Sequence, residues 1–311
     1  MEPILQIEHL SITFTQYSRG ARRREMPVIR DLSLSLSPGE VTAVVGASGS
    51  GKSLLAHAIL GLLPYNSRRK GSILYKGQEL TPRRLEKLRG REIALVPQGV
   101  TYLDPLMKVG PQLTQGRRDI DTRRRAREAL SRYGLGPGTE RLYPFQLSGG
   151  MARRVLMASA VMESPQLIIA DEPTPGLDAQ AAGRLLGHFR ELAQEGAAVL
   201  FITHDLELAL TVAHRVAVFY AGETIEEALA SDFEAGSLRH PFTQALWDAL
   251  PQRGFRPIPG SQPYPGEVGE GCPFLGQCPH PGAGCAQGPL PLRPFQGGAV
   301  RCLYPNKEVA P

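Results

Sequence analysis

Residues 46–53 read Gly-Ala-Ser-Gly-Ser-Gly-Lys-Ser and fit the pattern G-x-x-x-x-G-K-[ST]. An apolar run at residues 41–45 precedes them, and residues 52–62 carry apolar side chains at helical spacing. Glycines let such a loop turn tightly and point its N–H groups at phosphate oxygens, and the dipole of the following helix adds positive charge. The stretch therefore predicts a phosphate-binding loop between a strand and a helix of an α/β sheet.

Two side chains of this loop have specific expected tasks. Lys52 would reach the β- and γ-phosphates of a nucleotide, and the Ser53 hydroxyl would bind Mg²⁺. The loop residues expected to surround the phosphates are Gly46, Ser48, Gly49 and Gly51. A phosphate loop alone indicates only that a nucleotide binds, so a kinase, a GTPase and a motor all remain open.

The apolar run at residues 167–170 ends in two carboxylates, Asp171 and Glu172. A buried strand would deliver Asp171 to the Mg²⁺ beside the phosphate loop, as nucleotide hydrolysis requires. Glu172 would then accept a proton from the attacking water. Two adjacent acids could instead simply cap the next helix, but the phosphate loop favours the hydrolytic interpretation.

Strand and helix patterns alternate along most of the chain. This alternation predicts a largely parallel sheet covered by helices. Residues 19–25 read as a polar, arginine-rich insertion between the first strands. The runs typical of strands are 4–7, 10–14, 32–36, 41–45, 167–170, 198–203 and 216–220, and those typical of helices are 52–62, 82–90, 122–133, 179–194 and 206–213.

The composition is that of an ordinary globular protein, with 42% hydrophobic and 21% charged residues among 311. The sequence shows neither a secretion signal nor an apolar run of the about 18 residues that a spanning helix needs. We therefore expect a cytoplasmic chain that reaches a membrane only through a partner. Arginine clusters at residues 22–24 and 123–125 are typical of a solvated face, although lipid headgroups or an acidic partner also fit them, and no nucleic acid is expected.

The composition changes near Pro251, after which the chain is rich in proline and glycine. We expect residues 1–250 to form one domain and residues 251–311 an irregular C-terminal extension with too little apolar content for a core of its own. A cytoplasmic location argues against disulfides, so its cysteines suggest zinc, an iron–sulfur cluster or free surface thiols, and spacing alone does not choose. The four cysteines are Cys272, Cys278, Cys285 and Cys302.

Residues 147–151, Leu-Ser-Gly-Gly-Met, resemble the signature sequence of ATP-binding-cassette (ABC) ATPases. A serine hydroxyl and glycine N–H groups at a helix start form a second anion site. The resemblance implies that Ser148, Gly149 and Gly150 face the γ-phosphate held by the phosphate loop of an opposite subunit, so that two ATP molecules are sandwiched in a dimer. It also implies an α/β cassette with a RecA-like mixed sheet, an antiparallel β subdomain and a helical subdomain at about residues 99–165.

Other positions resemble further landmarks of the same family. Gln98 resembles the glutamine that senses Mg²⁺ and water, and His204 the switch histidine at the γ-phosphate. Asp178 resembles the aspartate of the loop that crosses the dimer interface. Phe14 lies about where the family stacks an aromatic ring on adenine, although it could equally be a core residue of a strand. The sequence departs from the usual pattern at Gly99, at residues 152–153 and at residues 175–176, which leaves the catalytic groups in place.

The C-terminal part of the chain, from residue 239 on, narrows the resemblance to the ATPases of peptide/nickel importers. The residues that carry it are 239–243 (Arg-His-Pro-Phe-Thr), 258–260 (Ile-Pro-Gly) and 271–279, and the likeness runs from about residue 4 to 304. In that family the four cysteines can hold a [4Fe–4S] cluster, which makes this cluster the first hypothesis and zinc the second.

These observations predict an ATP-binding and ATP-hydrolysing subunit that powers an ABC importer for peptides, nickel or opine-like metal chelates. Its implied partners are an identical or homologous ATPase subunit, two permease subunits docked through residues 99–135 and, indirectly, an extracytoplasmic binding protein. It would lie at the cytoplasmic face of the plasma membrane. A soluble ABC ATPase of DNA repair or translation, and a regulator without turnover, are the alternatives. The single compact cassette argues against the soluble ATPase, and Glu172 argues against the regulator.

Overall fold

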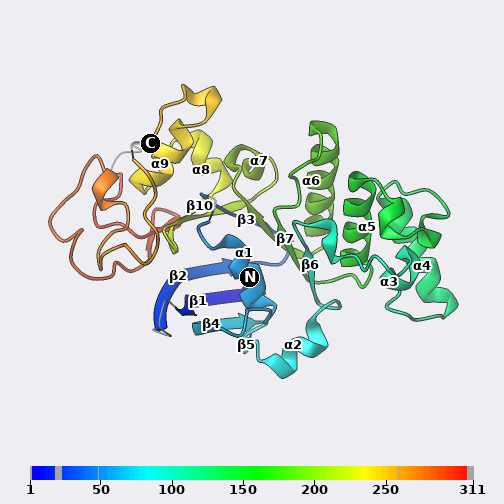
Figure 1. Cartoon of the computed structure of the whole chain (residues 1–311). Coiled ribbons are helices and arrows are strands. Elements are labelled where there is room, and N and C mark those ends of the chain that lie inside the picture. The colour runs from blue at the N-terminus through cyan, green and yellow to red at the C-terminus, as the bar shows by residue number, and fades with distance from the viewer. Residues whose placement is uncertain (1, 18–22, 48, 259, 307–311) are drawn as a thin grey trace.

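The computed structural model describes residues 2–17, 23–47, 49–258 and 260–306. Twelve strands form one continuous sheet in the order β5-β4-β1-β2-β10-β9-β3-β8-β7-β6, with β11 and β12 attached beyond β10 (Figure 1). The strands are β1 Leu5–Tyr17, β2 Arg23–Leu36, β3 Val41–Gly46, β4 Ser67–Tyr75, β5 Gln78–Glu79, β6 Ile93–Val96, β7 Leu167–Asp171, β8 Ala198–Thr203, β9 Arg215–Tyr220, β10 Glu223–Leu229, β11 Arg293–Phe295 and β12 Gly298–Val300. The helices are α1 Lys52–Ile59, α2 Pro82–Leu88, α3 Val109–Leu113, α4 Ile120–Arg132, α5 Gly149–Val161, α6 Ala179–Gln194, α7 Leu206–Leu210, α8 Ala230–Ala235 and α9 Pro241–Asp248.

The centre of the sheet is parallel and buried on both faces. Strands β6, β7, β8, β3 and β9 pair in parallel, and their residues are almost all inaccessible to solvent. Successive side chains of a strand point to opposite faces, so Ala43 and Val45 join one hydrophobic cluster and Val44 the other. Two covered faces explain why these strands read as continuous apolar runs rather than alternating ones.

The antiparallel part lies on one side of this centre. Strands β1, β2, β4 and β5 pair antiparallel and share a hydrophobic cluster with α1. The sequence predicted two strands, 4–7 and 10–14, whereas the structure has the single strand β1. Its register slips near His9, which has a φ of 49°, and that irregularity breaks the alternation on which the sequence prediction relied.

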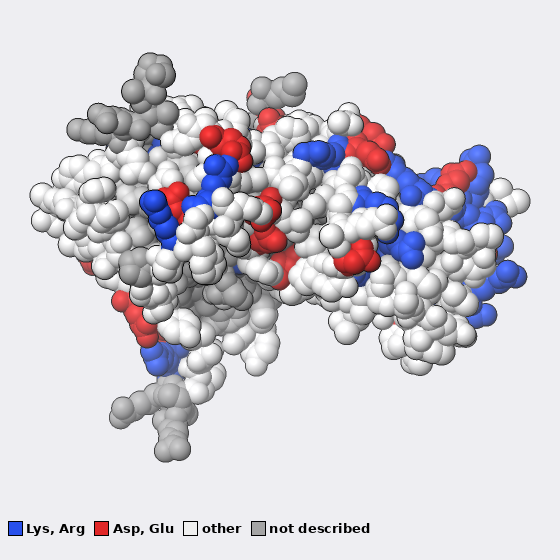
Figure 2. Space-filling model, turned by 90° about the horizontal axis from the view of Figure 1, so that it is seen from above, with Lys and Arg blue, Asp and Glu red and all other residues white. Residues whose placement is uncertain are grey.

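Helices α3, α4 and α5 gather at the end of the molecule remote from the C-terminal extension (Figure 1). Basic side chains crowd the surface of that end (Figure 2). Several of them are paired within the chain, since Arg124 lies 3.3 Å from Asp121 and Arg125 lies 3.5 Å from Glu163. These pairs support the interpretation of the cluster at residues 123–125 as a solvated face. Of the cluster at residues 22–24, Arg22 lies outside the described residues.

The C-terminal extension is joined to the sheet. Strand β12 pairs antiparallel with β10 through Glu226–Val300 and Glu227–Ala299, and β11 pairs with β12. Phe274 is buried in the main hydrophobic cluster together with residues of the parallel sheet. The extension thus obtains its apolar packing from the cassette, which agrees with its low apolar content. The boundary at residue 250 stays a prediction.

Candidate nucleotide-binding and catalytic site

The predicted phosphate loop lies between β3 and α1, as its sequence indicated. Gly51 precedes the first helical residue with a φ of 92°, a left-handed conformation that favours glycine. Gly46 ends β3 so close to β9 that a Cβ would lie 2.6 Å from the carbonyl oxygen of Phe219. Both glycines are therefore required by the backbone geometry. Gly49 has a φ of 79° and open space around it, and Ser48 lies outside the described residues.

Lys52 folds back over its own loop. Its Nζ donates hydrogen bonds to the carbonyl oxygens of Gly46 at 2.9 Å and Ala47 at 2.8 Å. Burial lowers the pKa of this ammonium group, and the charges of Glu172 and Asp171 oppose the shift. The ammonium group is thus held by two carbonyl oxygens of its own loop.

The Ser53 hydroxyl and Asp171 form a pair at the end of β7. The hydroxyl donates a hydrogen bond to Oδ1 of Asp171 at 3.1 Å. Burial raises the pKa of Asp171, while the hydrogen bond from Ser53 opposes this shift. Hydroxyl and carboxylate oxygens are the donors that Mg²⁺ prefers, so the pair fits a divalent cation that would also neutralise the buried carboxylate.

Glu172 lies at the meeting point of three chain segments. Its Oε2 accepts a hydrogen bond from Nε2 of Gln98 at 2.9 Å, and its Oε1 lies 3.1 Å from Nδ1 of His204. The residue has a φ of 41°, a strained conformation for a side chain of this kind, and its N–H donates to the carbonyl oxygen of Ile202. The structure therefore brings Gln98, Glu172 and His204 together beside the Ser53–Asp171 pair.

The residues that resemble the signature sequence start α5. Ser148 is its N-cap, and its hydroxyl accepts a hydrogen bond from the N–H of Met151. A Cβ at Gly149 or Gly150 would meet no atom within 4 Å, so this helix start is open to a partner. Within the described residues no hydrogen bond or ion pair joins these three residues to the phosphate loop.

Two further predicted residues are Asp178, at the start of α6, and Phe14, in β1. Asp178 caps α6, accepting a hydrogen bond from the N–H of Ala181 at 2.7 Å. Phe14 is half-buried in β1, where it faces Met26 of β2 across the ladder and packs against the cluster that contains α1. This placement fits both alternatives left open for Phe14, an adenine contact and a core residue.

Arg153 of α5 is one of the positions at which the sequence departs from the usual family pattern, and the sequence alone gives it no role. Its guanidinium donates to the carbonyl oxygen of Pro173 at 2.9 Å and lies within 4 Å of a Cβ built on Gly176. The helix that begins with Ser148 is thereby joined to the loop that follows Glu172. No local sequence signal identifies this contact, because the two residues belong to different elements.

The four cysteines line one small pocket, together with His240 and His280. Cys285 and Cys302 are buried, and Cys272 and Cys278 are half-buried. Burial raises the pKa of Cys272 to about 11 and also raises the pKa of Cys302, with the neighbouring thiols adding to both shifts. Among the described residues no three His, Cys, Asp or Glu side chains converge closely enough to hold a metal ion.

Buried charges anchor the extension to the cassette. Glu226 is fully buried, and its carboxylate accepts hydrogen bonds from the backbone N–H groups of Arg239 and His240 at 2.9 and 2.8 Å. The Arg239 guanidinium also reaches Asp232 at 2.9 Å and the carbonyl oxygen of Phe295 at 2.9 Å. The sequence showed residues 239–243 only as a resemblance, and the structure explains the arginine as the link between β10, α8 and β11.

Comparisons with known proteins identify the class of protein. A family model described as "ABC transporter" matches residues 29–175, and one described as "Oligopeptide/dipeptide transporter, C-terminal region" matches residues 225–285. The structure resembles the ATP-binding cassette MJ0796, solved as a dimer bound to ADP and Pi, with a TM-score of 0.62 and 26% identity over 73% of this chain and 98% of that chain. It also resembles CbiO1 from Clostridium perfringens, with a TM-score of 0.62 and 26% identity over 76% of this chain and 92% of that chain. The fold is that of an ABC ATPase, an ATP-hydrolysing cassette.

Curated relatives identify the family. The "Oligopeptide transport ATP-binding protein OppD" of Escherichia coli K12 is 34% identical over 99% of this chain and 95% of its own length. The "Dipeptide transport ATP-binding protein DppD" is 36% identical in E. coli K12, over 97% of both chains, and 35% identical in Bacillus subtilis 168, over 90% and 88%. The chain belongs to the oligopeptide/dipeptide family of ABC transporter ATP-binding subunits. The predicted fold class, the family and the ATPase activity are confirmed, and a DNA-repair or translation ATPase is not favoured.

Among the residues that the structure describes, no helix is both long enough and apolar enough to cross a bilayer.

Proposed function

We propose that this chain powers an ABC importer for peptides, in which its ATP site drives the permease between two conformations. The observation that carries the proposal is the convergence of Gln98, Glu172 and His204 beside the Ser53–Asp171 pair. A carboxylate next to a magnesium-type oxygen pair is the arrangement that nucleotide hydrolysis needs, because a water between them can lose its proton as it attacks.

Each residue of the site has a proposed task. The phosphate loop and Lys52 bind the phosphates, and Ser53, Asp171 and Gln98 hold Mg²⁺, which supplies charge neutralisation at the β- and γ-phosphates. Glu172 takes the proton of the attacking water. His204, at 3.1 Å from Glu172, holds that carboxylate and approaches the γ-phosphate. Phe14 contacts the adenine ring.

The second half of each site comes from another subunit in this proposal. Ser148, Gly149 and Gly150 present an open helix start, which favours a phosphate as ligand, and Asp178 lies in the loop that crosses the interface. The dimeric MJ0796 cassette supports such an assembly by analogy. The partner is an identical or a homologous ATPase subunit.

Two permease subunits dock against residues 99–135 of the helical subdomain. The chain then lies peripherally at the cytoplasmic face of the plasma membrane and receives the signal of a loaded binding protein indirectly. Peptides are the favoured cargo, since the names of the relatives specify oligopeptide and dipeptide transport. Nickel and opine-like chelates are the alternative cargoes.

The cargo is tested in the assembled transporter. The chain is reconstituted in nanodiscs with its permease and partner ATPase, and ATP turnover is measured with binding protein loaded with mixed peptides, with Ni²⁺ or with opines. We expect stimulation by peptide-loaded binding protein. Stimulation by Ni²⁺ or opines alone would contradict a peptide cargo, and turnover in isolation would still establish the ATPase.

We further propose that the four cysteines hold a [4Fe–4S] cluster. Four thiols on one pocket are the donor set of such a cluster. Zinc on the same thiolates is the alternative, and Cys272, Cys278, Cys285 and Cys302 would be the ligands of the cluster. It would supply a covalent staple to a segment that has little apolar content.

Chemical analysis tests the staple. Anaerobically purified protein should contain about four iron and four sulfide per chain, and Cys302→Ala should lose both. A Ser53→Ala variant, altered only at the ATP site, should keep them. Stoichiometric zinc, or neither metal nor sulfide, would overturn the cluster.

A further inference from the structure

The phosphate loop is supported from behind by two different elements. At its start, Gly46 pairs with Phe219 at the end of β9, too close for any side chain. At its end, Gly51 lies against Val28 and Ile29 of β2, where a Cβ would meet Cγ1 of Ile29 at 3.1 Å. The position of the loop therefore depends on how β2 sits relative to β9 and the turn that follows it.

That turn contacts β2 directly. Gly222, with a φ of 81°, accepts hydrogen bonds at its carbonyl oxygen from the N–H groups of Arg30 at 2.8 Å and Asp31 at 3.3 Å. A Cβ on Gly222 would lie 2.7 Å from the carbonyl oxygen of Val28. A single parallel pair, Glu223 with Asp31, joins β10 to β2. The backbone connection between the two supports is thus short.

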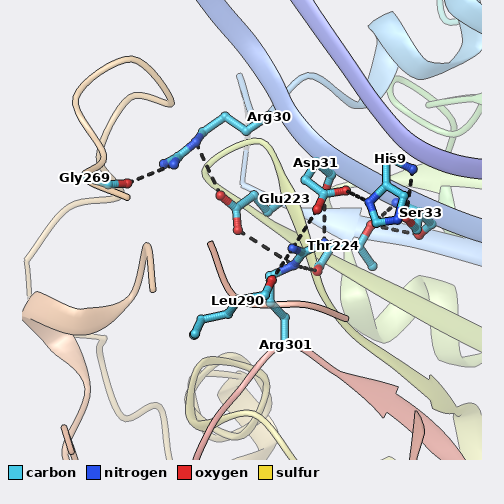
Figure 3. Close-up of polar contacts among 9 residues, drawn as sticks. All are labelled: His9, Arg30, Asp31, Ser33, Glu223, Thr224, Gly269, Leu290 and Arg301. Carbon is cyan, nitrogen blue, oxygen red and sulfur yellow. Dashed lines mark hydrogen bonds and ion pairs between the residues drawn. The ribbon is translucent and has the colours of Figure 1, made fainter. Parts of the chain in front are cut away.

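A buried arginine from the C-terminal extension reinforces this short connection. Arg301, whose side chain is 1% exposed, donates from Nη1 to Oδ2 of Asp31 at 2.9 Å and from Nε to the carbonyl oxygen of Thr224 at 2.8 Å. Its Nη2 donates to the backbone carbonyl oxygen of Asp31 at 3.2 Å, and its Nε lies 3.7 Å from Glu223. Figure 3 shows this guanidinium between the β2 and β10 residues.

Arg30 extends the same network on the other side. Its Nε lies 3.3 Å from Oε1 of Glu223, and its Nη2 donates to the carbonyl oxygen of Gly269 in the extension at 2.8 Å (Figure 3). Glu223 is therefore shared by one arginine from β2 and one from the extension. Removing one partner of a buried charged hydrogen bond lowers stability strongly, because the charge that remains is buried without a partner.

We propose that Arg301 is a positioning residue for ATP binding: by joining Asp31 of β2 to β10, it fixes the spacing between the two supports of the phosphate loop. Within the described part of the chain, no hydrogen bond or ion pair joins Arg301 to the loop or to the residues that hold Glu172. It acts through β2 at Gly51 and through the β9–β10 turn at Gly46. The proposal requires only that ATP binds at this loop, whatever the cargo of the transporter.

The test separates ATP affinity from turnover in the full chain. Arg301→Gln should raise the KM for ATP and the Kd for a non-hydrolysable ATP analogue about five- to tenfold, the range of coupling through packed elements. The kcat per active site should change less than about twofold, because the groups around Glu172 are untouched. Arg301→Lys, which keeps one ionic contact, should restore part of the affinity.

A matched control exists in the same extension. Arg293 bonds to the carbonyl oxygen of Cys302, next to Arg301, through its own guanidinium. Arg293→Gln should leave KM and Kd unchanged. Equal effects in the two variants, or an unchanged KM in folded Arg301→Gln, would overturn the proposal.

A second variant keeps the test decisive if Arg301→Gln does not fold. Asp31, the β2 partner of Arg301, is 27% exposed, and Asp31→Asn removes the ionic contact without changing Arg301. This variant should fold and raise the KM for ATP about two- to threefold. Hydrogen exchange at the amides of residues 49–53 should quicken in the same variant. Unchanged KM and unchanged exchange would overturn the proposal.

Discussion

Glu172 accepts a hydrogen bond from the side-chain amide of Gln98 at 2.9 Å across 74 residues of sequence. The other carboxylate oxygen lies 3.1 Å from Nδ1 of His204. The two contacts fix the orientation of a carboxylate on a strained backbone, directly after the residue that bonds to Ser53. The orientation of the proposed base therefore depends on three separate segments, which follow the parallel strands β6, β7 and β8.

Removal of either contact should slow hydrolysis without preventing ATP binding. We expect Gln98→Ala and His204→Ala each to lower kcat about 10- to 100-fold, and the double variant to lose less than the product, because both residues act on Glu172. Steady-state turnover and equilibrium binding of ATP measure the two quantities. His188→Ala is the matched control, since His188 makes the same 3.1 Å contact to Glu191 away from the site. A loss of kcat in the double variant equal to the product of the two single losses would argue against a common action on Glu172.

A substitution at Ser148, the start of α5, should affect turnover but not ATP binding by the monomer. Ser148→Arg should leave ATP binding by the monomer unchanged, because Ser148 makes no contact with the phosphate loop of its own chain among the described residues. Turnover should fall at least about 100-fold, since the arginine would block the second anion site. Ser131→Arg on the exposed face of α4 serves as the control. Loss of monomer binding would indicate that both halves of the site lie in one chain.

We expect Glu227 to make the free energy of unfolding depend on pH. Burial raises its pKa to about 7 from 4.5, with Arg215 opposing the shift. The folded state therefore holds a proton that the unfolded state has already lost between about pH 4.5 and 7, so this contribution to stability is present at low pH and disappears as pH rises through 7. Glu227→Gln should remove the decline and gain at most about 3 kcal/mol over the natural chain at pH 8.

Denaturant unfolding at pH 5 and pH 8 measures this difference. The exposed Glu86, changed to Gln, should leave the pH dependence as it is in the natural chain. Parallel stability curves for the natural chain and Glu227→Gln would show that the Glu227 carboxyl titrates alike in both states.

The packing of the cysteine region is tested by one added methyl group. A Cβ on Gly271 would lie 2.3 Å from the carbonyl oxygen of Cys285, whereas a Cβ on Gly276 would meet nothing within 4 Å. Gly271→Ala should lower the free energy of unfolding by about 1–3 kcal/mol through overpacking. Gly276→Ala should change it by less than about 0.5 kcal/mol. Equal stabilities would show that residues 271 and 285 do not pack as described.

The sequence alone predicts the elements that bear buried apolar runs and the loops that bear special chemistry. The helix at 179–194 and the strand at 198–203 agree with the structure to the residue, because each has a clear period and clear ends. Strand β10 was not predicted, since Glu223, Glu226 and Glu227 give it the composition of an exposed segment. The burial of Glu223 and Glu226 depends on Arg30, Arg239 and Arg301, which come from distant parts of the chain.

The candidate site follows the same division. The local motifs predict Lys52, Ser53, Asp171 and Glu172 without any structure, because each motif is a fixed spacing of residue types within one segment of the chain. Arg153 and Arg301 carry no such pattern. Each is recognised only when the fold brings its guanidinium to a carbonyl or carboxylate of another element.

The most direct test of the proposed mechanism is the steady-state ATP turnover of Glu172→Gln, measured together with ATP binding and dimer content. The variant keeps the shape of the side chain, exchanges one accepting oxygen for an amide donor and removes the base. It should bind ATP as the natural chain does, lose turnover by about 100-fold or more, and accumulate as an ATP-bound dimer. Undiminished turnover, with ATP bound normally, would contradict the assignment of Glu172 as the base.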